Sequence, residues 1–89
     1  MIRRNTTIIN KLGLHARAAA KLVGLASKFK SDIKLAKNST EVNGKSILGV
    51  MMLAAAINTP LELIADGPDE VAALDALEAL IARRFDEAE

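Results

Sequence analysis

The chain contains one histidine, His15, in the stretch from Asn10 to Arg17 that reads Asn-Lys-Leu-Gly-Leu-His-Ala-Arg. An alanine-rich helical pattern begins directly after His15, so the imidazole is expected at a helix N-terminus. The first N–H groups of a helix have no acceptor within it, and the helix dipole adds partial positive charge there, which favours a bound phosphate. Imidazole is also a competent nucleophile near neutral pH. These features predict a histidine that carries a phosphoryl group, against the plainer alternative of a histidine that only begins a helix.

Arg17 lies two residues after His15, in the first turn of the same expected helix. A cation is slightly unfavourable at this end of a helix, because the dipole is positive there. A phosphate on His15 would reverse that sign and give the guanidinium a charge-assisted partner. We therefore interpret Arg17 as a phosphate-stabilising residue, the alternative being an ordinary surface arginine.

Ser46 precedes a short apolar segment and is expected to cap a helix over 47–53. This segment is apolar on all sides, although a two-turn helix can bury only one of them. Val50 and Leu53 are expected in the core. The side chains left partly exposed are predicted to form a docking surface for partner proteins, the alternative being an adaptable core lined by methionine; they are Ile47, Leu48 and Met51.

Both segments resemble the HPr family, the histidine phosphocarriers of bacterial phosphotransferase systems. Gly-Leu-His-Ala-Arg at 13–17 is similar to the active-site signature of that family, and Val42 to Met51 is similar to its regulatory-serine region. The order of the two segments, their separation and the chain length all agree, so the resemblance covers essentially the whole chain. One departure is Ala18, where the family usually has proline. Alanine is the best helix former, so a helix is still expected to begin here.

The resemblance implies a phosphocarrier rather than an enzyme with its own turnover. His15 would accept a phosphoryl group on Nδ1 from enzyme I and donate it to an enzyme IIA, with Arg17 stabilising the phosphate. Ser46 would be a site for an HPr kinase/phosphorylase. Sugar-linked transport and a nitrogen-linked or regulatory branch are both compatible with the resemblance. The alternative function is a non-carrier regulatory homologue that binds partners under Ser46 control, although such a protein would not need His15.

The composition indicates one small domain over residues 1–89 with no cofactor. A chain of 89 residues with 51% hydrophobic and 26% charged residues is typical of a globular protein. Cysteine is absent and histidine occurs once, which argues against disulfides and against a transition-metal site. The residues after Arg3 and Arg4 are polar, unlike a signal peptide, and no run reaches membrane-spanning length. We expect a cytoplasmic monomer without membrane insertion.

The charges are divided unevenly between the two halves of the chain. Residues 1–45 hold ten Lys or Arg and two acids, whereas 46–89 hold two Arg and nine acids. A basic half could indicate nucleic-acid binding, but aromatic residues are only 2% of the chain and Tyr and Trp are absent, so stacking platforms are missing. We therefore expect no nucleic-acid partner. The basic half is interpreted as steering the chain toward acidic protein partners.

The hydrophobic pattern predicts the order β-α-β-β-α-β-α. Strands are expected over 2–9, around 33–35, up to Val42 and around 61–63, and helices after His15, over 47–53 and after Asp69, which should cap the last one. The apolar stripe of that last helix is Val71, Leu74, Leu77, Ile81 and Phe85. The acidic residues of this helix and of the tail after it are expected to be solvated surface; they are Asp75, Glu78, Asp86 and Glu87. This pattern fits an α+β open-faced two-layer sandwich, a four-stranded antiparallel sheet with three helices on one face.

Overall fold

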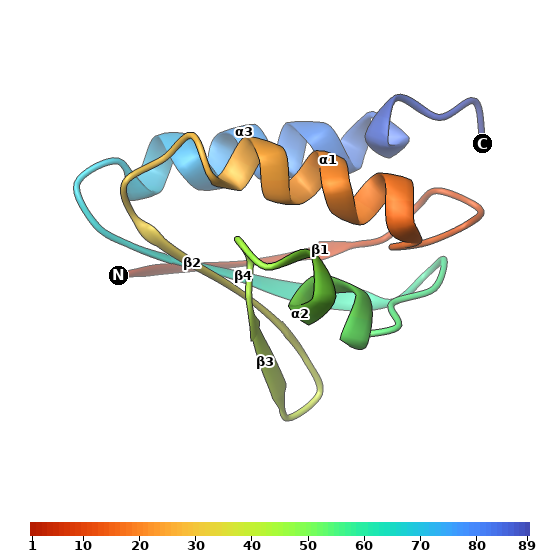
Figure 1. Cartoon of the computed structure of the whole chain (residues 1–89), viewed down its shortest axis with the longest axis horizontal. Coiled ribbons are helices and arrows are strands. Elements are labelled where there is room, and N and C mark those ends of the chain that lie inside the picture. The colour runs from red at the N-terminus through yellow and green to blue at the C-terminus, as the bar shows by residue number, and fades with distance from the viewer.

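The computed structural model describes all 89 residues and shows a four-stranded antiparallel sheet covered by helices (Figure 1). The strands have the order β1-β4-β2-β3 in the sheet. Helices α1 and α3 lie side by side over it, and α2 packs against α1 and β3. The predicted fold class is confirmed. The elements in chain order are β1 (Ile2–Thr7), α1 (Ala16–Ala26), β2 (Asp32–Lys37), β3 (Thr40–Asn43), α2 (Ile47–Met52), β4 (Pro60–Asp66), α3 (Glu70–Ala82) and a 3₁₀ turn, η1 (Arg84–Asp86).

The core lies between the sheet and the helices. The central strands supply fully buried leucines, and Leu35 of β2 is in register with Leu63 of β4. Leu22 of α1 and Leu77 of α3 cover them from the helical layer and are equally buried. The other face of the sheet carries polar side chains, among them Arg3, which forms an ion pair with Glu62 at 2.9 Å. No helix in the chain is long and apolar enough to cross a membrane.

Strand β1 is shorter than the pattern predicted. It ends at Thr7, and Ile8 instead exchanges hydrogen bonds with the loop before β4, through its N–H to the carbonyl of Thr59 at 3.0 Å and through its carbonyl to the N–H of Asn58 at 2.7 Å. Ile8 is fully buried and Ile9 is exposed. The β-branched run therefore continues past the sheet into the loop that leads to His15.

The end of α3 also differs from the prediction. Leu74, Leu77 and Ile81 are buried as expected, but Val71 is 53% exposed and lies outside the apolar stripe. The helix ends at Ala82, and the three residues of η1 adopt left-handed φ angles of 57°, 54° and 62°. Phe85, in the middle of this turn, is fully buried. Phe85 thus reaches the core through a left-handed turn rather than as a further turn of α3.

Asp69 occupies the N-cap position of α3, but its side chain does not cap the helix. Its carboxylate accepts hydrogen bonds from the backbone N–H groups of Lys30 and Ser31, both at 2.9 Å, and from the Ser31 hydroxyl. The hydrogen bond from Ser31 and the backbone bond from Lys30 lower the pKa of Asp69 to about 2. The prediction that Asp69 caps α3 with its side chain was therefore wrong. The carboxylate instead binds a loop distant in sequence, which offers three hydrogen-bond donors.

Candidate functional site

His15 is the N-cap residue of α1, as the sequence predicted. Its backbone is extended, with φ −74° and ψ 178°, and its side chain makes no capping bond and is 29% exposed. The N–H groups of residues 16–18 have no backbone acceptor, so the first turn presents free donors beside the ring. Ala18 is fully buried and does not disturb the helix start. This arrangement suits an anion held next to the imidazole.

The loop before His15 is held in place by Gly13 and Leu14. Gly13 has a φ of +67°, and a Cβ atom there would overlap the carbonyl oxygen of Ala55. The next residue, Leu14, is buried and donates its N–H to the same carbonyl at 2.8 Å. A left-handed conformation and a close backbone approach together explain a glycine at this position. The contact fixes the chain immediately before the imidazole.

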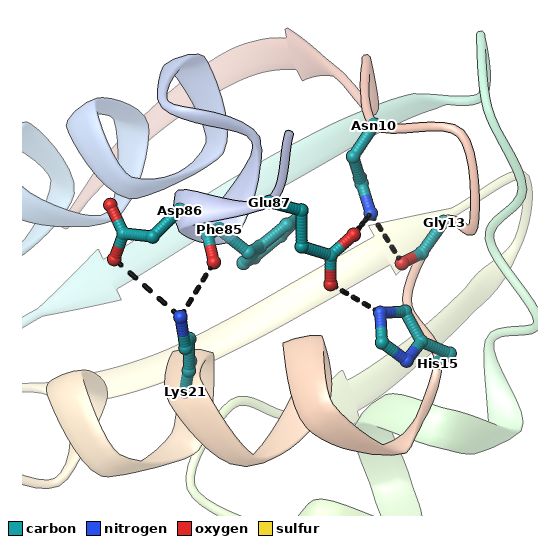
Figure 2. A network of polar contacts seen from close by, with 7 residues as sticks. All are labelled: Asn10, Gly13, His15, Lys21, Phe85, Asp86 and Glu87. Atoms are coloured by element: carbon teal, nitrogen blue, oxygen red, sulfur yellow. Dashed lines mark hydrogen bonds and ion pairs between the residues drawn. The ribbon is translucent and has the colours of Figure 1, made fainter. Parts of the chain in front are cut away.

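Glu87 contacts the imidazole from the last residues of the chain (Figure 2). Its Oε2 accepts a hydrogen bond from Nε2 of His15, and its Oε1 accepts one from Nδ2 of Asn10 at 2.9 Å. Asn10 is fully buried and donates a second hydrogen bond to the carbonyl of Gly13, also at 2.9 Å. The side chain of Glu87 is only 14% exposed. The prediction that Glu87 belongs to the solvated surface was therefore wrong.

The segment that carries Glu87 is fixed by Phe85 and by two lysines. The Phe85 ring is buried between the helices, and its carbonyl accepts a hydrogen bond from Nζ of Lys21 at 2.8 Å (Figure 2). Nζ of Lys21 also forms an ion pair with Oδ2 of Asp86 at 3.7 Å. At the other end of the segment, Lys11 forms an ion pair with Glu89 at 3.5 Å. These contacts hold Glu87 over the start of α1.

The surroundings of Glu87 keep its side chain ionised at neutral pH. Burial alone would raise the pKa of Glu87. The hydrogen bonds from Asn10 and His15, together with electrostatic attraction from His15 and Arg17, outweigh that effect and hold the pKa below its ordinary value. A carboxylate, rather than a carboxylic acid, therefore faces the imidazole.

Arg17 lies beside His15 but forms no hydrogen bond with it. Its side chain is exposed, and it lines an open groove of about 710 Å³ with His15 and Glu87. The remaining lining residues are Lys11, Leu12, Ala16, Ala88 and Glu89. No cluster of three or more His, Cys, Asp or Glu side chains is placed to hold a metal ion. The groove thus combines a nucleophilic ring, one free cation and the open end of a helix.

The structure bears out the expected cap and the exposed side of α2. The Ser46 hydroxyl accepts a hydrogen bond from the N–H of Gly49 at 3.1 Å, as an N-cap does. Val50 and Leu53 are buried, as predicted. The three predicted surface residues, Ile47, Leu48 and Met51, are 44%, 76% and 39% exposed. We call these three residues the α2 patch.

Part of the uneven charge is used within the molecule. Arg4 of β1 forms ion pairs with Asp75 at 2.5 Å and Glu78 at 2.9 Å on α3. Lys37 donates to the carbonyl of Leu53 at 3.0 Å and so satisfies the C-terminal end of α2. The basic and acidic halves of the sequence therefore also attract each other across the fold, in addition to any effect on partners.

Comparison with known proteins decides the family. A family model described as "PTS HPr component phosphorylation site" matches residues 2–83. The chain belongs to the HPr family. It is 61% identical over 89 residues to phosphocarrier protein HPr of Cupriavidus necator, and the match covers all of both chains.

The HPr fold is equally well matched by solved structures. The crystal structure of HPr-C-His from Thermoanaerobacter tengcongensis superposes with a TM-score of 0.96 at 44% identity and full coverage of both chains. An HPr dimer from the same organism superposes with a TM-score of 0.79 at 45% identity, covering 98% of this chain and 100% of that one. The predicted resemblance to the HPr family is therefore confirmed along the whole chain.

Asn10 and Glu87 are the two residues at this site that the sequence analysis missed. Glu87 lies 72 positions from His15, and no spacing rule connects them. The spacing of Phe85, four positions after Ile81, continues the helical pattern of α3 and so predicts a further helical turn, not a contact with His15.

Proposed function

We propose that this chain carries a phosphoryl group on His15, accepted at Nδ1 from a phosphohistidine of enzyme I and donated to a histidine of an enzyme IIA. The observation that carries the proposal is the position of His15. The only imidazole of the chain is partly exposed in an open groove at the N-terminus of α1, beside unpaired N–H groups. Membership of a phosphocarrier family supports the same function.

The transfer step is a displacement at phosphorus. The Nδ1 lone pair forms a bond to the phosphorus atom while the donor's N–P bond breaks, and the electron pair of that bond returns to the donor imidazole. The free N–H groups of residues 16–18 and the guanidinium of Arg17 stabilise the negative charge on the phosphoryl oxygens. The site is open and supplies few donors, so the group is held weakly enough to leave in the second transfer.

The chain acts as a co-substrate rather than as an enzyme. It takes the phosphoryl group from one protein and delivers it to another, and it completes no turnover by itself. We propose that it does so as a cytoplasmic monomer. Its exposed lysines steer it toward acidic partner surfaces.

The α2 patch is proposed as the docking surface for these partners, and Ser46 as its regulator. Exposed apolar side chains grouped on one helix of a small domain favour a protein contact. Ser46 lies directly before Ile47 and Leu48, so a phosphate added there by an HPr kinase/phosphorylase would bring about −1.5 to −2 charges to the edge of the patch. Such a charge would oppose an acidic partner.

The decisive experiment is incubation of the purified chain with enzyme I and phosphoenolpyruvate. We expect one acid-labile, base-stable phosphoryl group on the wild-type chain, identified as phosphohistidine by mass spectrometry. The His15→Ala variant should keep its melting temperature within a few degrees and acquire no such group. Labelling of His15→Ala at the wild-type level would contradict the proposal. A wild-type chain that stays unlabelled would favour a non-carrier regulatory homologue.

A further inference from the structure

We propose that Glu87 and Asn10 are positioning residues that hold the proton of His15 on Nε2 and so leave Nδ1 as the phosphoryl acceptor. This inference rests on the proposed function and adds to it the reason why one ring nitrogen reacts. The residues concerned come from three separate parts of the chain. Asn10 precedes α1, His15 begins it, and Glu87 follows α3 and η1 (Figure 2).

The hydrogen bond between His15 and Glu87 determines which ring nitrogen carries the hydrogen. An ionised carboxylate can only accept hydrogen bonds, so Nε2 of the ring must be the donor. A neutral imidazole carries one N–H, and with the hydrogen on Nε2 the lone pair lies on Nδ1. Nδ1 points away from Glu87 (Figure 2). The carboxylate thus selects both the tautomer and the direction of the nucleophilic nitrogen.

The side-chain amide of Asn10 has one defined orientation. Its Nδ2 donates to Oε1 of Glu87 and to the carbonyl of Gly13, both at 2.9 Å. Rotating the amide by half a turn would place its oxygen against two acceptors, which fixes the orientation. The Oδ1 atom is buried without a partner, so these two donor contacts are what holds the side chain. Asn10 therefore fixes which oxygen of Glu87 remains for His15.

Glu87 also faces the charge that develops on the ring during transfer. When Nδ1 bonds to phosphorus, the Nε2 hydrogen stays on the ring, which becomes a phosphorylated imidazolium. Glu87 faces that positive charge through the same hydrogen bond. The carboxylate thus stabilises the ring while the group is carried, without touching the phosphorus atom. A related arrangement, in which a carboxylate sets a histidine tautomer, is known from serine proteases.

Glu87→Gln gives the sharpest test. The glutamine oxygen would still face Nδ2 of Asn10, which leaves the glutamine NH₂ group facing Nε2 of His15. An NH₂ group donates, so it would favour the tautomer with hydrogen on Nδ1, the wrong nitrogen. Glu87→Ala only removes the partner and leaves both tautomers available. We therefore expect acceptance of the phosphoryl group to fall in the order wild type, Glu87→Ala, Glu87→Gln, with Glu87→Gln slower than wild type by about 10-fold.

The measurement uses potassium phosphoramidate, a small-molecule phosphoryl donor, so that docking of a partner does not enter. ¹⁵N NMR of the His15 ring reports which nitrogen carries the hydrogen, and ³¹P NMR reports which nitrogen carries the phosphoryl group. Wild type should show hydrogen on Nε2 and phosphate on Nδ1. Glu87→Gln should shift hydrogen to Nδ1 and place part of the phosphate on Nε2. A merely structural role for Glu87 would not change these signals.

Two further variants make the test specific. Glu41→Gln makes the same chemical change as Glu87→Gln at an exposed position on β3, away from the groove. It should react like wild type. Adding Asn10→Ala to Glu87→Gln frees the glutamine amide to rotate, so its oxygen can accept from Nε2. The double variant should therefore react faster than Glu87→Gln alone.

The results separate this inference from the proposed function. Equal rates and unchanged ring signals in wild type and Glu87→Gln would overturn the role of Glu87 while leaving His15 as the carrier. A Glu41→Gln variant as slow as Glu87→Gln would assign the effect to the change in net charge and overturn the role of the His15 tautomer. A double variant no faster than Glu87→Gln would overturn the role of Asn10. A wild-type chain that no donor phosphorylates on His15 would instead contradict the proposed function.

Discussion

The hydroxyl of Ser31 donates a hydrogen bond to the carboxylate of Asp69 over 2.5 Å and so ties the loop before β2 to the start of α3. Gly67 approaches the same serine closely enough that a Cβ atom would lie 2.6 Å from Ser31 Cα. The three residues form a packed junction at the end of the molecule away from His15. Because the ionised carboxylate of Asp69 holds this junction together, the free energy of unfolding should decrease when that carboxylate is protonated.

Asp69→Asn is expected to destabilise the fold at pH 7, because an amide cannot accept all the hydrogen bonds that the carboxylate accepts. The folded pKa of about 2 lies below the ordinary value of 3.8, so the stabilisation by Asp69 is fully present above pH 4 and is lost as the pH falls toward 2. Urea unfolding should therefore show a difference between wild type and Asp69→Asn that shrinks over this range. The control is Asp32→Asn, which changes an exposed aspartate directly after Ser31. A difference that stays constant down to pH 2 would contradict this role of Asp69.

Ser46→Asp should slow phosphoryl transfer from enzyme I without lowering the melting temperature. Aspartate is a good N-cap and an anion is favourable at a helix N-terminus, so α2 remains folded while the new charge faces the docking partner. Ser46→Ala should instead lose about 1 kcal/mol of stability and transfer almost normally, because the hydrogen bond to Gly49 is lost and no charge is added. Initial rates and thermal unfolding distinguish the two variants. Transfer at the wild-type rate in Ser46→Asp would limit Ser46 to capping.

Leu48→Asp should weaken docking of enzyme I by about 1–2 kcal/mol and leave the stability within about 0.5 kcal/mol of wild type. Leu48 is 76% exposed, so its replacement removes little packing within the chain. Val71→Asp is the matched control, because Val71 is 53% exposed on α3, away from the α2 patch. The half-saturating concentration of the chain in the enzyme I reaction measures the effect. Equal losses in the two variants would show that the α2 patch is not the contact surface.

Arg17→Glu should slow phosphoryl transfer by about 10-fold, because a like charge replaces a cation beside the phosphate. Lys34→Glu makes the same charge change on the open face of the sheet and should cost less. Reversing several lysines together should mainly lower the association rate, with an effect that fades in high salt. Stopped-flow rates at two ionic strengths provide the measurement. A wild-type transfer rate in Arg17→Glu would show that Arg17 does not stabilise the phosphate.

The fold could be predicted because each main element has a periodic signal of its own. The apolar stripe of α1, the alternation in β4 and the cap at Ser46 are all local patterns, and each is repeated in the structure. His15 at the N-cap and the exposed α2 patch followed from the same patterns. Local periodicity was sufficient wherever a residue's role depended on its own helix or strand.

The remaining features depend on contacts between distant parts of the chain. Asp69 has the sequence context of a cap, yet three donors from residues 30 and 31 attract its carboxylate. The left-handed turn at 84–86 contains no glycine, so the local sequence does not predict it. Glu87 reaches His15 because the left-handed turn before it buries Phe85, whose carbonyl accepts a hydrogen bond from Lys21. In each case tertiary contacts determine the conformation, and the local sequence favours something else.

The position of the last residues also decides how the protein can be handled. The carbonyl of Glu89 accepts a hydrogen bond from the N–H of Lys11, so any label or surface attached at residue 89 would sit at the mouth of the groove. Met1 lies at the end of the molecule opposite to residue 89 (Figure 1). Its amino group is exposed there and forms ion pairs with Asp66 and Glu70. Immobilisation through residue 1 keeps the imidazole accessible. The same attachment through residue 89 would obstruct the groove.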